Sequence, residues 1–530
     1  MTTHAGHVRQ IASAASIVSI ATLVSRVLGF VRDMAIAWLF GAGMMADAFF
    51  LAFRIPSTLR ELLGEGALSA AFIPTFTRTA TREGREAAWD LVSVVMGTLV
   101  VVLAGVMLLG VVFAPEIVGV LAWGPGFANI PGKVPLTIQL LRVMFPYIFL
   151  VGLAALFMAV LNSLGHFLTP ALSPAVLNIA MISAALLIAP HSSNPALPLG
   201  IAVVVGGVGQ LFIQVPAAVA RGWRARLRVA PLDPRVREVA RLMAPGVLGL
   251  SITQINVFVG LSLASFLAQG SVAALTYALR LVQFPIGVIA VPIGTGALPV
   301  MAASIAKDAV GEMKGALQGS LRLALFLTLP AMVGLMLFRL PILHVLFERG
   351  AFTRPVTVLT AQILLAYSLG LVFYVSNRIL APAFYAMHDT WTPVKVGMVA
   401  VGVNIVASII LMGPLGAAGL ALATAVSSLS NFLLLFTVLR RRIGLLGMRR
   451  LAFPATKICL ACVPMAAWGV VSQSWWGVLA VPGTAAKAAL LCGEVGVAVA
   501  LFAVTAAALR CEEFGWALAL LRRRRSREQE

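Results

Sequence analysis

The residues of this chain that could do chemistry are charged side chains set inside stretches that are otherwise apolar enough to span a membrane. Residues 25–78 hold the densest group of them. A charge at the centre of a bilayer costs about 2.5–3.5 kcal/mol on insertion scales, so such residues face one another or a water-filled cavity. We therefore expect a charged wall around a transport path, built from Arg26, Arg32, Asp33, Asp47, Arg54, Arg60, Glu61 and Glu65.

The second apolar segment of this stretch indicates how the wall is built, because its charges share one face of a helix. Arg54, Thr58, Glu61 and Glu65 follow Asp47 at offsets of 7, 11, 14 and 18 residues. At 100° per residue, all five side chains fall within about 40° of one direction. The alternative, charges that reach out to both membrane surfaces, does not suit a stripe that runs through the middle of the segment.

The composition places the whole chain in a membrane. Of its 530 residues, 60% are hydrophobic and only 11% are charged, and the mean hydropathy is +1.00. A soluble protein carries about 25% charged residues, so we expect an all-α protein that crosses the bilayer many times. Motifs of nucleotide-binding loops, zinc proteases and serine hydrolases are missing from the sequence, so we expect neither an enzyme nor a resident cofactor or metal. Cys459 and Cys462 lie in an apolar stretch, and we interpret both as small buried residues.

Fourteen membrane spans can be drawn, and the basic residues orient them. With the N-terminus in the cytoplasm, the cytoplasmic segments hold 23 Lys and Arg residues, whereas the outer loops hold three, Lys133, Arg349 and Arg354. We therefore expect both termini in the cytoplasm. Basic clusters of this kind also occur in nucleic-acid-binding proteins, but beside membrane spans their simpler role is topology and contact with anionic headgroups. The spans are predicted near residues 11–38, 45–73, 89–113, 136–163, 170–190, 198–220, 238–268, 272–303, 317–340, 357–386, 393–412, 415–439, 452–472 and 485–510.

The chain repeats itself at an offset near 220 residues. "AFRIP" at 52–56 recurs loosely as "ALRLVQFP" at 278–285, which aligns Arg54 with Arg280, and further echoes follow in the same order. Six spans separate the matching elements, so the two halves have the same orientation and are related by an axis along the membrane normal. The predicted organisation is an N-lobe at 1–220, a basic cytoplasmic linker at 221–241, a C-lobe at 242–440, and two extra helices with a basic tail at 441–530.

The embedded charges also indicate the kind of substrate. We find the embedded acids in the first lobe only, so the second lobe offers Arg280 and Arg378 without local neutralisation, and Gln283 shares a helical face with Arg280. Guanidinium groups bind phosphate through paired hydrogen bonds, so we expect an anionic, phosphorylated substrate. An exporter of cationic drugs would need the reverse, acids in the cleft. For Arg378 the alternative is a salt bridge at a helix end or between the lobes.

Several segments carry a resemblance to a known family. They are "SRVLGFVRD" at 25–33, "FGAGMMADAFFLAFRIPSTLRELLGEGALSAAFIP" at 40–74, "LNSLGHFLTPALSPAVLNI" at 161–179 and "LAPAFYAMHDTWTPVK" at 380–395. These segments are similar to the bacterial lipid II flippases, MurJ (also MviN), of the multidrug and polysaccharide exporter superfamily. The resemblance implies a protein of the inner membrane that moves lipid II, an undecaprenyl-pyrophosphate carrying a disaccharide-pentapeptide, to the outer leaflet by alternating access for cell-wall synthesis.

The resemblance also implies roles for individual residues. The family's essential cavity arginines fall on Arg26, Arg32, Arg60 and Arg280, its acidic positions fall on Asp33, Asp47 and Glu65, and its basic position in the second span falls on Arg54. We expect the acids, with Arg54 and Glu61, to balance charge and set conformation. This sequence departs from the family at Leu279 and Gln283, where acids are common, so a salt-bridge partner of Arg280 is either missing or comes from elsewhere.

The energy source and the alternatives follow from the same chemistry. Movement of each unneutralised negative charge outward gains about 2.3 kcal/mol per 100 mV of an inside-negative potential, so membrane potential could drive part of the cycle without ATP. A sodium ion or a proton is the other candidate for coupling. We expect a monomer in contact with membrane lipids, lipid II and the cell-wall synthesis machinery. Three alternatives stay open: a flippase for another polyprenyl-pyrophosphate glycan, a drug or cation antiporter, and a non-transporting scaffold.

Overall fold

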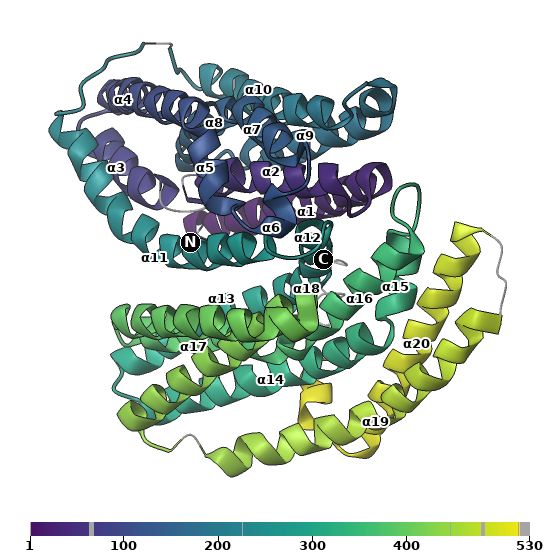
Figure 1. The fold of residues 1–530 in the computed structure, drawn as a ribbon. Coiled ribbons are helices and arrows are strands. Elements are labelled where there is room, and N and C mark those ends of the chain that lie inside the picture. Colours follow the sequence, from purple (N-terminus) through teal and green to yellow (C-terminus); the bar gives the residue numbers. More distant parts are fainter. Residues whose placement is uncertain are drawn as a thin grey trace. The chain divides into compact units, whose positions relative to one another are not determined.

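The computed structural model describes residues 2–62, 68–224, 226–445, 447–478, 483–517 and 519, and within these ranges it contains helices and connections but no strand (Figure 1). The all-α prediction is confirmed. The helices are α1 (Thr2–Phe40), α2 (Met44–Leu62), α3 (Leu68–Arg82), α4 (Arg85–Val112), α5 (Ala114–Leu121), α6 (Pro125–Ala128), α7 (Lys133–Met144), α8 (Pro146–Ser163), α9 (Leu168–Ser183), η2 (Ala184–Ile188), η3 (Ala189–His191), α10 (Ala196–Val219), α11 (Pro234–Ala264), α12 (Ser271–Pro285), η4 (Ile286–Ala290), α13 (Val291–Ala306), α14 (Val310–Leu337), α15 (Arg339–Leu346), α16 (Arg354–Leu369), α17 (Leu371–Ala386), α18 (Trp391–Ile443), α19 (Met448–Val478) and α20 (Thr484–Ala508).

The described helices account in number for the predicted spans. Nine are long and apolar enough to cross a membrane, and the pair α16 and α17, bent by 41°, makes a tenth. α18 has 53 residues and is long enough for two spans, which adds one more. The chain kinks between them at Gly416, where φ is 54° and the left-handed backbone suits glycine. α1, α2 and α11 carry more polar and charged residues and are not among these apolar helices. When they are counted as well, the total reaches the predicted fourteen.

The helices pack into two compact units. One unit is Met1–Ala273 with Arg349–Phe352, and the other is Ala274–Glu348 with Thr353–Glu530. α11 belongs to the first unit because it packs against α2, α3, α4 and α5. The packing boundary therefore falls one span later than the predicted linker at 221–241, and the division into repeated lobes stays a prediction.

α8 lies at the centre of the first unit. It packs against α3, α4, α9 and α10, and most of its residues are buried. Two glycines bring α10 close to its neighbours: a Cβ on Gly206 would lie 2.6 Å from Leu177 Cδ1, and one on Gly207 would lie 2.8 Å from Tyr147 Cδ2. Small residues of this kind let membrane helices pack closely against one another. In the same unit, α9 packs against α1, and α8 and α10 pack against α2.

The second unit has two apolar cores that meet along α14. The first joins α13, α14, α17 and α18 around Ile379, Leu380 and Phe384, which are all fully buried. The second joins α14 to the C-terminal helices α19 and α20 around Phe326 and Phe502, whose ring centroids are 5.2 Å apart. The two extra C-terminal helices thus attach to this unit through α14 and α15 (Figure 1).

Candidate functional site

The charges of α1 form a buried cluster with α9. Arg32 and Asp33 are 8% and 1% exposed, and Arg32 donates from Nε and Nη2 to Asp33 Oδ1 at 3.0 and 2.7 Å. Its Nη1 donates to Asn178 Oδ1 at 3.1 Å, and Asn178 in turn donates to the carbonyl oxygen of Ser25. Arg26, one turn and a half earlier, is exposed. The two predicted cavity arginines of α1 therefore differ, since Arg32 is held by its neighbours and Arg26 is accessible.

Asp47, at the start of α2, has a partner that sequence reasoning missed. Lys133 Nζ lies 2.8 Å from Asp47 Oδ2, and both side chains are only 1% exposed. The backbone N–H groups of Gly270 and Ala273 also donate to this carboxylate, at 2.7 and 2.9 Å, and Lys133 Nζ lies 4.1 Å from the ring centroid of Phe127. Lys133, which the sequence analysis counted with the outer loops, is the first residue of α7 and is buried. Its burial follows from the pairing, because a fully buried acid requires a charged partner or several donors.

The middle of α2 meets α11 through a glutamine. Gln254 accepts from Arg54 Nη2 at 2.9 Å and from Thr58 Oγ1 at 3.3 Å, and its amide nitrogen donates to Glu61 Oε2 at 2.8 Å. Arg54 and Glu61 themselves are 3.8 Å apart, and both are half-buried. The predicted stripe of Arg54, Thr58 and Glu61 on one face of α2 is thus observed in these contacts, whereas Glu65 lies outside the described residues.

A small cavity adjoins this bridge. It measures about 290 Å³ and lies between α2 and α11, with the apolar side chains of Ile55, Leu59, Ile255 and Phe258 on its walls and Gln254 at its polar edge. Arg60 is half-buried and lies about 120° round the helix from Arg54. Polar groups at the edge of an apolar hollow can orient an amphipathic molecule.

In the second unit, the predicted site residues are accessible. Arg280 on α12 is exposed, as is Gln283, and Arg280 Nη1 donates to Gln283 Oε1 at 3.4 Å. Arg378 on α17 is also exposed, while its backbone packs so closely on α13 that a Cβ at Gly294 would lie 2.8 Å from the Arg378 carbonyl oxygen. The predicted convergence of Arg280 with Arg26, Arg32 and Arg60, which belong to the other unit, stays a prediction.

Two expectations from the sequence were wrong. Embedded acids are not confined to the first lobe, because Glu494 of α20 is 3% exposed and its carbonyl oxygen accepts from Trp468 Nε1 at 3.1 Å. The sequence already contained this indication, because Glu494 is the one acid within the predicted span 485–510. Cys462 is buried, but Cys459 is exposed. Among the residues that the structure describes, no group of three or more His, Cys, Asp or Glu side chains is placed to hold a metal ion.

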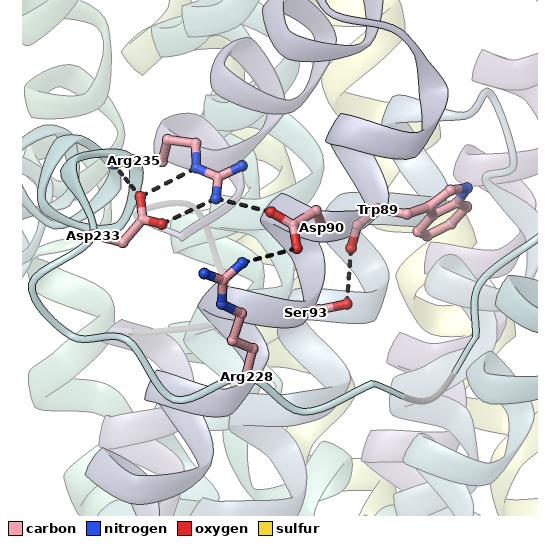
Figure 2. A network of polar contacts seen from close by, with 6 residues as sticks. All are labelled: Trp89, Asp90, Ser93, Arg228, Asp233 and Arg235. Carbon is pink, nitrogen blue, oxygen red and sulfur yellow. Dashed lines mark hydrogen bonds and ion pairs between the residues drawn. The ribbon is translucent and has the colours of Figure 1, made fainter.

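A second charged network lies away from α1 and α2, where the segment between α10 and α11 meets the start of α4 (Figure 2). Asp90 Oδ2 accepts from Arg235 at 2.9 Å, and Asp90 Oδ1 lies 3.6 Å from Arg228 Nη1. Asp233 accepts from the backbone N–H and the guanidinium of Arg235 and so caps the N-terminus of α11. The hydrogen bond from the Arg235 side chain lowers the pKa of Asp233, against the opposing effect of partial burial.

Known proteins of one family resemble this chain in sequence and in fold. The family model for the lipid II flippase MurJ matches residues 36–485. A Burkholderia cenocepacia protein named lipid II flippase MurJ is 34% identical over 469 residues, which cover 87% of this chain and 90% of that protein. A solved structure of a lipid II flippase MurJ, inward closed conformation, matches with a TM-score of 0.76 and 26% identity over 93% of this chain and 99% of that chain. An inward-facing multidrug resistance MATE family transporter of the MOP superfamily, 16% identical, shares the fold with a TM-score of 0.69 over 81% of this chain and 98% of its own. The chain belongs to the lipid II flippase family, MurJ.

Proposed function

We propose that this protein moves lipid II from the inner to the outer leaflet of the bacterial cytoplasmic membrane. Family membership supports the proposal, because the relative from Burkholderia cenocepacia and the matching solved structure both carry the name lipid II flippase. The substrate would be an undecaprenyl-pyrophosphate with a disaccharide-pentapeptide. Its headgroup is large and anionic, so a transporter must offer it a hydrated path lined by cations, while the prenyl tail can stay in lipid.

The observation that carries the substrate class is the sign of the accessible charge on the spans. Arg26, Arg280 and Arg378 are exposed, whereas the acids Asp33 and Asp47 are each 1% exposed and already bonded. The two acids therefore balance charge inside the helix bundle, and the exposed charge at the other three positions is cationic. A guanidinium binds a pyrophosphate through paired N–H donors and keeps its charge at any physiological pH.

The cycle that fits this fold is alternating access without a covalent step. Outward movement of the anionic headgroup gains about 2.3 kcal/mol per unneutralised charge per 100 mV of inside-negative potential, so no nucleotide is needed. A sodium ion or a proton could supply further coupling. In this proposal the protein acts as a monomer with both termini in the cytoplasm, and no residue acts as a catalyst, because no bond of the substrate changes.

Complementation of a strain depleted of its own lipid II flippase tests this function. The chain should restore growth, and lipid II should become accessible to an externally added enzyme that cleaves it only at the outer surface. The matched control is a strain depleted of a flippase for another polyprenyl-pyrophosphate glycan. If the chain restored surface glycan in the control strain and left the first strain inviable, its substrate would be that glycan and not lipid II.

A further inference from the structure

Residues 226–233 belong to the segment that connects α10 to α11, and they lie beside α4 rather than beyond its end. Arg228 N donates to Ser93 O at 3.3 Å, and a Cβ on Gly97 would lie 2.4 Å from the Arg228 carbonyl oxygen. Gly97 lies twelve residues after Arg85, the first residue of α4, which is about 18 Å along the helix axis. Since α4 carries no charge after Asp90, this part of the connecting segment lies level with the beginning of an apolar membrane span.

The inner side of the connecting segment is fixed by the network of Figure 2. Arg235 holds Asp90 with a hydrogen bond of 2.9 Å, and Asp233 accepts from the same guanidinium. Arg228 is a weaker partner of Asp90, at 3.6 Å, and its side chain is 65% exposed. The segment is therefore held in place mainly by Arg235, which leaves Arg228 able to bind another anion.

The outer side of the connecting segment is amphipathic. Leu227, Val229 and Leu232 are 64%, 57% and 72% exposed, and the arginines on either side of Leu227, Arg226 and Arg228, are exposed as well. Apolar side chains interleaved with arginines are the composition of segments that lie in a membrane interface, where the apolar groups enter the acyl boundary and the guanidinium groups remain at the phosphates.

We propose that residues 226–232 form an interfacial site for the headgroups of anionic phospholipids. Three observations combine: the segment lies level with the apolar part of α4, its apolar side chains are exposed, and its arginines complement a phosphate in charge. None of its residues belongs to the proposed substrate site. An arginine near an anionic membrane surface contributes about 1 kcal/mol, which is about fivefold in affinity for each and about 25-fold for two.

Lipid retention tests the charged part of the site. The full-length protein is reconstituted into nanodiscs of phosphatidylcholine with increasing phosphatidylglycerol, released, and examined by native mass spectrometry. Arg226→Gln with Arg228→Gln should lower the apparent affinity for phosphatidylglycerol about 25-fold. The matched control, Arg349→Gln with Arg354→Gln, removes two exposed arginines of a predicted outer loop and should leave the apparent affinity for phosphatidylglycerol unchanged. Equal losses in both variants, or no loss in the first, would overturn the proposal.

Depth measurement tests the apolar part, in a variant that lacks the four native cysteines. An environment-sensitive fluorophore on Leu227→Cys should emit as in an apolar medium and be quenched by nitroxide-labelled lipid. The same fluorophore on Glu83→Cys, an exposed position just before α4, should emit as in water and be quenched by iodide. Adding Gly97→Ala, which displaces the Arg228 backbone, should shift the Leu227 signal toward water. A water-like signal at Leu227 in the parent would show that the segment does not enter the interface.

Discussion

Loss of the lysine from the buried pair of Asp47 and Lys133 should destabilise the protein strongly. Lys133→Met keeps the length of the side chain and removes its charge. The carboxylate of Asp47, 1% exposed, would then keep only the backbone donors of Gly270 and Ala273. At the observed 2.8 Å between Nζ and Oδ2, the attraction between unit charges is about 6 kcal/mol with an effective dielectric constant of 20. Removal of one partner of a buried ion pair typically costs about 3–5 kcal/mol, and we expect a loss in that range.

Unfolding in mixed detergent and dodecyl sulfate micelles measures this free energy, and a double-mutant cycle isolates the pair. Lys133→Met with Asp47→Asn should recover a large part of the loss, because the asparagine oxygen still accepts from the two backbone N–H groups without a buried charge. The matched control is Lys395→Met, at an exposed position of α18, which should change stability by less than about 0.5 kcal/mol. If Lys133→Met proved as harmless as Lys395→Met, or if the double variant were no more stable than the single one, the two charges would not form a buried pair.

Three further predictions concern other parts of the molecule. Arg280→Lys should reduce complementation partially because it loses the paired donors, whereas Arg280→Ala and Arg280→Glu should abolish it at matched membrane levels; normal growth with the glutamate would remove Arg280 from the substrate site. Gln254→Leu should destabilise the protein by about 1.5–3 kcal/mol in the same unfolding assay, since Arg54 and Glu61 each lose a hydrogen bond to a charged group, and an unchanged stability would mean that water replaces the bridge. The pKa of Asp233 is lowered in the folded protein, so its stabilising effect is full above the ordinary aspartate pKa of about 3.9 and is lost as pH falls through the lowered value; Asp233→Asn should flatten that part of the pH–stability curve, and an unaltered curve would contradict the assignment.

The sequence predicted the parts of this protein that depend on local pattern. An apolar run must form a helix in lipid, so composition and hydropathy indicated an all-α membrane protein with fourteen spans. The spacing of Arg54, Thr58 and Glu61 predicted one helical face, because side-chain direction within a helix follows from residue offset alone. All three are indeed in contact with one residue, Gln254.

Other features of the candidate site could not be read from local pattern. Lys133 stands in a short stretch between apolar segments, and its burial depends on the way α2, α7 and Phe127 enclose it. Arg32 and Arg26 belong to the same motif, yet Arg32 is buried against Asn178 and Arg26 is exposed. The motif could not predict this difference, because Asn178 lies on α9, 146 residues after Arg32. A charge in a span predicts a partner or a cavity but does not say which.

The sequence by itself determined the class of the protein, its family and the residues that carry charge into the membrane. Those properties depend on the free energy of transferring side chains and peptide groups into lipid. This free energy is set within each segment, almost independently of the other segments. The tertiary structure decided which charges are buried against one another and which remain exposed. Electrostatic energy depends on the separation of two groups and on their exposure to water, and both quantities are fixed only when helices distant in the sequence pack together.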